Sequence, residues 1–243
     1  MSSWGGSTAA DPELEGHLVM TRLLDWSKHV TLTDNPLLTV HFPSEADEQP
    51  WLSIGYAGLF GALSAVSESG VSACLNMGNN DSSQGGAPYH PILLSVRSGM
   101  EQADYDGDGS HTPDDVAAAI AERARNIDTI VHVTKDEGSA SRPIIVESNN
   151  AAGVAVRDAS DNTLVPGEHL VATNHFRVLY PPVYCYRYAG IADSLAASAA
   201  MSCDRSWDVM SGAAGVWGSN IQCIQYVESQ GLIYWSMDTY TEP

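Results

Sequence analysis

The chain has 243 residues, 44% of them apolar, which is enough for a sizeable core in one large domain or two small ones. Eleven Lys and Arg residues against 30 Asp and Glu give a formal charge of −19, which argues against nucleic acid or anionic lipid as partners. No apolar run reaches the roughly 18 residues of a membrane span, and the start lacks the basic and apolar regions of a signal peptide. We therefore expect a soluble protein.

The first half of the chain alternates short apolar stretches with Gly, Asn, Asp and Pro clusters, a pattern typical of strands joined by turns. It predicts strands over 17–26, 37–42, 52–66 and 70–77. A helix is predicted over 113–127, because Pro113 and Asp114 favour a first turn and the apolar residues that follow share one face.

The second half predicts strands over 142–148, 153–158 and 169–180, then helices over 184–201 and 206–215 after a Pro-Pro break. Two closing strands within 220–238 are expected to turn at 229–231. There is no internal repeat or low-complexity linker. The prediction is one α+β domain, 1–243, with helices layered on antiparallel sheets.

The cysteines, Cys74, Cys185, Cys203 and Cys223, are widely spaced and include no C-x-x-C pair. This spacing argues against a zinc ribbon or a thioredoxin-type site. Buried thiols or one disulfide are the simpler expectation.

The segment ADYDGDGSHTPDDV (103–116) has the spacing of an EF-hand calcium loop. Glycine stands at loop position 6, where a sharp turn is needed, and oxygen-bearing residues stand at the alternate ligand positions. Position 12 is Asp rather than Glu, as in dockerin-type loops, which this one resembles. We expect a structural calcium ion in a loop over 104–115, with a solvated acidic turn as the alternative. The predicted ligands are Asp104, Asp106, Asp108, Ser110, Thr112 and Asp115.

Three stretches place polar residues in apolar surroundings. Arg22 and Asp25 end the first long strand, Asn76 closes the apolar run of GVSACLN (70–76), and Asn174 lies in ATNHF (172–176). Packing alone offers a plain interpretation: a structural ion pair between Arg22 and Asp25, and buried amides with satisfied hydrogen bonds.

Taken in order, RLLDW (22–26), GVSACLN and ATNHF resemble motifs of the N-terminal-nucleophile (Ntn) hydrolases related to isopenicillin-N acyltransferase and, more distantly, to bile-salt hydrolases and penicillin V acylase. The resemblance covers about residues 16 to 236 and includes the closing strands. It implies a four-layer αββα sandwich whose catalyst is the first residue of the processed chain, acting on a small-molecule amide or acyl substrate without an organic cofactor.

The resemblance also implies roles for individual residues. Asp25 would contact the terminal amine, Arg22 would orient the nucleophile, and Asn76 and Asn174 would bind the amine and the oxyanion. Arg187 is a weaker match to a downstream arginine of bile-salt hydrolases.

The nucleophile itself is the point of departure. The family's cysteine, freed by self-cleavage of a pro-segment, falls near residues 1 to 3, where this chain has Met1, Ser2 and Ser3. Three explanations stay open: Met stands where the processed cysteine belongs, removal of Met1 exposes Ser2 as the nucleophile, or the chain is an inactive relative. The first is favoured, because the family pattern begins where this sequence begins.

Other interpretations belong to different classes. One is a non-catalytic, calcium-stabilised binding domain of the same fold; another is a different hydrolase, for which His175 is a candidate base, although Gly-x-Ser-x-Gly, His-Glu-x-x-His and Walker patterns are absent. A calcium loop and a pro-segment favour an extracytoplasmic location. Homo-oligomer formation and the choice between hydrolysis and acyl transfer stay open.

Overall fold

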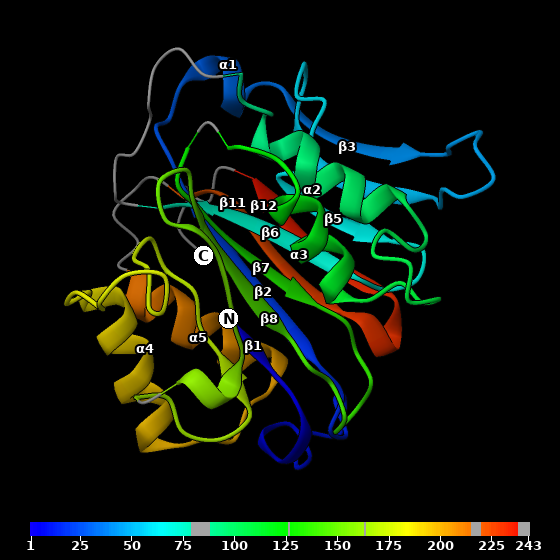
Figure 1. Cartoon of the computed structure of the whole chain (residues 1–243). Coiled ribbons are helices and arrows are strands. Elements are labelled where there is room, and N and C mark those ends of the chain that lie inside the picture. Colours follow the sequence, from blue (N-terminus) through cyan, green and yellow to red (C-terminus); the bar gives the residue numbers. More distant parts are fainter. Residues whose placement is uncertain (79–87, 126, 163, 215–219, 238–243) are drawn as a thin grey trace.

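Two antiparallel sheets form the centre of the computed structural model, which describes residues 1–78, 88–125, 127–162, 164–214 and 220–237 (Figure 1). The first sheet has the order β10-β1-β2-β11-β12 and the second runs from β3 to β9 in sequence order. The first comprises β1 (Ser2–Ser3), β2 (Val19–Asp25), β10 (His169–Leu170), β11 (Asn220–Val227) and β12 (Leu232–Met237). The second comprises β3 (Pro36–His41), β4 (Trp51–Tyr56), β5 (Ser64–Ser67), β6 (Ser72–Met77), β7 (Thr129–Thr134), β8 (Ile144–Asn149) and β9 (Gly153–Arg157).

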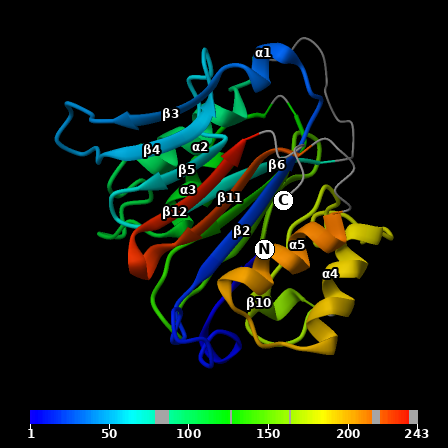
Figure 2. The same cartoon turned by 180° about the vertical axis from the view of Figure 1, so that it is seen from behind.

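Helices cover the outer face of each sheet (Figures 1 and 2). Helices α2 (Ile92–Glu101) and α3 (Pro113–Ala121) pack on the seven-stranded sheet, whereas α4 (Tyr186–Ala197) and α5 (Cys203–Ala214) cover the five-stranded sheet, with α5 against β2. The short elements are α1 (Val30–Thr33) and three 3₁₀ turns, η1 (Gly5–Ser7), η2 (Ala159–Asp161) and η3 (Glu228–Gln230).

Strand alternation divides the buried residues into three cores, which explains the layering. On β2, Met20 joins the core between the sheets while Val19 joins the core under α4 and α5. On β6, Cys74 faces the inter-sheet core while Leu75 packs under α2 and α3. Successive side chains of a strand point to opposite faces, so each sheet buries both sides. The result is the predicted four-layer αββα sandwich.

The strand predictions in 17–26, 37–42, 70–77, 142–148, 153–158 and 220–238 correspond to observed strands, with the final turn at Gly231. The single strand predicted over 52–66 is wrong: β4 and β5 are separated by a turn in which Gly58 has φ +88°, a conformation that favours glycine. Helix α2 and strand β7 had no predicted counterpart.

Two other predicted elements are shorter than expected. Helix α3 ends at Ala121 because the Arg125 guanidinium donates to the carbonyl oxygens of Ile120 and Ala121 and so satisfies the last turn. The strand predicted over 169–180 ends at Leu170; the amides of residues 177–179 donate to the Glu147 carboxylate instead of to a neighbouring strand. None of the described helices is long and apolar enough to cross a membrane.

Candidate active site

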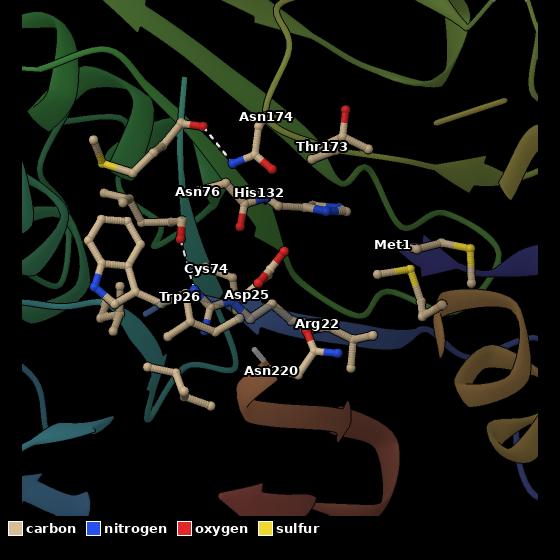
Figure 3. A pocket seen from close by; sticks show the side chains of 18 of the residues that line it. Met1, Arg22, Asp25, Trp26, Cys74, Asn76, His132, Thr173, Asn174 and Asn220 are labelled. Atoms are coloured by element: carbon tan, nitrogen blue, oxygen red, sulfur yellow. Dashed lines mark hydrogen bonds between the residues drawn. The ribbon is translucent and has the colours of Figure 1, made fainter. Parts of the chain in front are cut away.

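A pocket of about 340 Å³ lies at the end of the sandwich where β2 and β6 finish and β11 begins (Figure 3). Its walls are mostly aliphatic and aromatic, with contributions from both sheets and from α2, α4 and α5. Its polar lining residues are Arg22, Asp25, Tyr56, Asn76, His132, Thr173, Asn174, Arg187 and Asn220. The site residues predicted on separate stretches of the sequence therefore meet in one place, with the exception of Ser2.

Residue 1 lies in this pocket. The Met1 side chain packs with the α4–α5 core, while its amine donates to the carbonyl oxygen of Thr21 at 2.8 Å. Burial lowers the pKa of the amine from 8.0 to about 5, Cys74 opposes the shift, and the Arg22 charge adds to it. At neutral pH this amine is therefore uncharged and its lone pair can accept a proton.

Ser2 differs from the prediction. It is fully buried, is not among the residues that line the pocket, and its hydroxyl is 3.0 Å from the Nε2 atom of His132. The Met1 side chain packs under α4 and α5, whereas the Ser2 hydroxyl faces His132 of β7. Trp4 follows β1 and precedes the η1 turn.

Arg22 is held by groups that carry no charge. Its Nη1 atom donates to the Gln222 side chain at 2.6 Å and its Nη2 atom to the Leu75 carbonyl oxygen at 2.9 Å. Among the described residues, its Nε atom has no hydrogen-bond partner. The hydrogen bonds of Arg22 therefore go to neutral groups, and not to Asp25 as in the structural ion pair that the sequence suggested.

Asp25 instead forms an ion pair with Arg187 of α4. Arg187 also lies 3.4 Å from the side-chain oxygen of Asn174. The Asn174 amide donates to the Met77 carbonyl oxygen at 2.8 Å, the dashed line at Asn174 in Figure 3. These contacts join β2, β6, α4 and the segment after β10. The strand predicted around Asn174 is replaced by a loop that projects this side chain toward the pocket.

The loop that carries Asn174 is anchored by Glu147. This fully buried carboxylate accepts the backbone amides of Arg177 at 2.8 Å, Val178 at 3.0 Å and Leu179 at 3.0 Å. It also pairs with Arg157 at 2.9 Å, so its charge is compensated from both sides. Sequence reasoning missed Glu147, because a single Glu in a strand gives no signal until its distant partners are known.

His132 and Tyr56 also line the pocket without having been predicted. His132 lies directly opposite Cys74 on the neighbouring strand, and burial holds its pKa well below the usual value. The segment TIVHVT (129–134) gave no signal beyond one His among strand formers. The alternative base, His175, is partly buried and is not among the pocket residues.

The acidic loop lies apart from the pocket. The carboxylate oxygens of Asp104, Asp106 and Asp108 come within 4.8 Å of one another. The Gly109 amide donates to Asp104 at 3.1 Å, and Gly109 has the positive φ, +95°, that the prediction required of loop position 6.

The other three predicted ligands have internal partners. The Ser110 hydroxyl donates to Asp108 at 2.8 Å, and Thr112 caps α3. Asp115 is fully buried and accepts the backbone amides of Tyr105, Asp106 and Thr112, so it is outside the carboxylate cluster. Its place at the third helical position makes it part of a capping box.

The four cysteines, all within the described residues, form no disulfide; Cys74, Cys185 and Cys223 are buried and Cys203 is partly buried. This agrees with the buried-thiol interpretation. Of the four, only Cys74 lines the pocket.

Comparisons with known proteins give a clear result at the level of the fold. The structure is similar to an N-acylethanolamine-hydrolyzing acid amidase ortholog from Caenorhabditis elegans, with a TM-score of 0.64 and 13% identity, covering 96% of this chain and 94% of that one. It is also similar to two variants of conjugated bile acid hydrolase from Clostridium perfringens. One has a TM-score of 0.54 at 10% identity, with coverage of 100% and 94%; the other has 0.54 at 11%, with 99% and 90%.

The chain has the Ntn-hydrolase fold. No protein-family model and no curated protein matches the sequence. The fold and the αββα prediction are thus confirmed, whereas the finer link to isopenicillin-N acyltransferase stays a prediction.

Proposed function

We propose that this protein is an Ntn amidohydrolase or acyltransferase whose nucleophile occupies the position of residue 1. The observation that carries the proposal is the convergence of residue 1, Arg22, Asp25 and Asn174 on one pocket from separate parts of the chain. The fold shared with two amide-hydrolysing proteins supports it.

The buried amine supplies the base that this chemistry needs. With cysteine at position 1, the neutral amine would take the thiol proton as the sulfur attacks the amide carbonyl carbon. Asn76 and Asn174 would donate to the oxyanion that forms, each donor contributing about 3 kcal/mol. The C–N bond then breaks, the proton leaves with the amine, and a thioester remains for water or a second amine to open.

A methionine thioether has no proton to lose and cannot take this role. Exposure of Ser2 is the weaker alternative, because its hydroxyl faces His132 and lies outside the pocket lining. These contacts support cysteine over serine as the residue that would make the site active.

The pocket walls indicate the kind of substrate. Leu24, Trp26, Leu59, Ile92 and Met210 are among the residues that surround the polar groups. An apolar acyl group would remove the apolar surface of these walls from water, and this burial would stabilise the bound state by roughly 25 cal/mol per Å². We propose an amide with an apolar acyl part as the substrate class.

Three forms of the N-terminus test the proposal: the chain with Met1, the Met1→Cys chain released from a cleavable leader, and the Met1→Ala chain released in the same way. Hydrolysis of a panel of N-acyl amines, followed by mass spectrometry, should appear only in the Met1→Cys chain and should disappear when its terminal amine is acetylated. Adding a second amine distinguishes acyl transfer from hydrolysis. Absence of turnover by the Met1→Cys chain would favour the alternative, an inactive binding domain of the same fold.

We also propose that the acidic loop binds a structural calcium ion through Asp104, Asp106 and Asp108. Three converging carboxylates and the Gly109 turn support it, since calcium prefers oxygen ligands from a flexible loop. The ion would hold the connection between α2 and α3, whose residues are not part of the pocket lining. We also propose an extracytoplasmic location, because calcium would fill such a loop more readily there.

A further inference from the structure

Two hydrogen-bond donors in the pocket lack partners among the described residues: the hydroxyl of Tyr56 and the Nε atom of Arg22. Tyr56, at the end of β4, is 6% exposed and Arg22 is 4% exposed, so water does not reach either atom freely. A buried donor without an acceptor is costly, and native structures contain few of them. Two in one pocket indicate an acceptor that arrives with a ligand.

The two donors are close enough to influence each other. The Arg22 charge acts to lower the pKa of the Tyr56 hydroxyl, although burial is the larger effect and raises it to about 12. The hydroxyl therefore keeps its proton at neutral pH and can donate it.

The guanidinium of Arg22 cannot turn to another partner. Gln222, itself fully buried, accepts from Arg22 Nη1 and from the Ser64 hydroxyl at 2.8 Å, and its own amide donates to the Ile54 carbonyl oxygen. With Nη2 on the Leu75 carbonyl oxygen, the orientation of the Nε atom is fixed. The result is a buried positive charge held by neutral groups, a setting that favours an anionic or strongly polar oxygen as the missing acceptor.

We propose that Tyr56 is a ligand-binding residue whose hydroxyl, together with Arg22 Nε, holds an oxygen of the acyl group in the pocket. This oxygen is the second carboxylate oxygen of the free acid, which water supplies in hydrolysis; the carbonyl oxygen of the amide is the one to which Asn76 and Asn174 would donate. This assignment rests on the proposed function for the acyl nature of the ligand.

Binding to the chain as it stands, with Met1, tests the assignment without any need for turnover. The probes are octanoate and 1-octanol, which share an alkyl chain while only octanoate carries a carboxylate. Isothermal titration calorimetry should show that Tyr56→Phe weakens octanoate binding about tenfold, the usual effect of losing one hydrogen bond to a charged group, and changes 1-octanol binding less than twofold.

The matched control is Tyr188→Phe. Tyr188 is also buried, but its hydroxyl donates to Asn162 at 3.3 Å and it is not among the pocket residues. It should leave octanoate binding unchanged. Without ligand, the two substitutions should change the Tm in opposite directions. Tyr56→Phe should raise the Tm because it removes an unsatisfied hydroxyl, and Tyr188→Phe should lower it because it removes a hydrogen bond.

Each other outcome counts against the proposal. Equal octanoate affinity in the wild-type and Tyr56→Phe proteins overturns the role of Tyr56 and leaves the proposed function standing. Equal losses for octanoate and 1-octanol mean that Tyr56 only shapes the wall. If the wild-type protein binds neither probe, the acyl ligand class of the proposed function fails, and this inference fails with it.

Discussion

The carboxylate of Asp25 and the guanidinium of Arg187 form an ion pair that ties the end of β2 to the first turn of α4. The same guanidinium reaches the side-chain oxygen of Asn174. One guanidinium therefore joins Asp25, near the start of the chain, to Asn174.

Breaking this pair should cost activity more than stability. Because both side chains are partly exposed, Asp25→Asn should lower the free energy of unfolding by less than about 1 kcal/mol in a urea titration. In the Met1→Cys background, kcat/KM for an amide substrate should fall about 100-fold, the effect of a slightly misplaced catalytic group. Asp193→Asn, on the exposed face of α4, is the control and should change neither quantity. An unchanged kcat/KM in Asp25→Asn would contradict the proposed site.

The buried pair of Glu147 and Arg157 should behave differently. Glu147→Gln leaves a buried guanidinium without its counter-charge, so the free energy of unfolding should fall by about 3–5 kcal/mol. Glu101→Gln breaks a pair with a similar distance, Arg97–Glu101 at 2.8 Å, but on a partly exposed helix face. Its expected cost is under about 1 kcal/mol. If both variants lose the same free energy of unfolding in chemical denaturation, burial does not determine the cost of breaking these ion pairs.

Glu228 gives the protein a pH dependence of its own. Burial, together with the nearby Asp136 and Glu137 charges, raises the pKa of this carboxyl from 4.5 to about 7. The folded state therefore holds a proton that the unfolded state has released between pH 4.5 and 7, so this group's contribution to stability decreases as the pH rises through that window.

Glu228→Gln removes the titration. The variant should match the wild type near pH 4.5 and exceed its free energy of unfolding by roughly 1–2 kcal/mol at pH 8, well below the full value of the shift because the carboxyl is partly solvated. Urea titrations across this range measure the difference. Glu45→Gln, an exposed residue, should show no such trend. A stability difference that is the same at pH 4.5 and pH 8 would argue against a raised pKa.

Calcium should stabilise the chain through the acidic loop. Thermal unfolding with about 5 mM calcium, compared with excess chelator, should show a higher Tm because the ion binds the folded loop only. Asp106→Asn with Asp108→Asn should abolish the increase, while Asp193→Asn should retain it. No increase at millimolar calcium, or the same increase in the double variant, would refute the site.

The sequence was sufficient to predict most strands, the α+β class and the candidate residues Arg22, Asp25, Asn76 and Asn174. These predictions depend on local alternation, turn residues and short motifs, which are written in neighbouring positions. The acidic loop was likewise visible because its spacing lies within a dozen residues.

The partners of those residues were decided by the tertiary structure. Glu147 accepts the amides of residues 177–179, so a strand-like run becomes a loop, and Asp115 becomes part of the capping box of α3. Asp25 pairs with Arg187 across 162 positions of sequence. Arg22 binds Gln222, which is 200 positions away. The sequence determines which side chains are present and which face each strand presents. Only the packing of the two sheets brings distant polar groups close enough to satisfy one another, and leaves Tyr56 and Arg22 Nε without partners among the described residues.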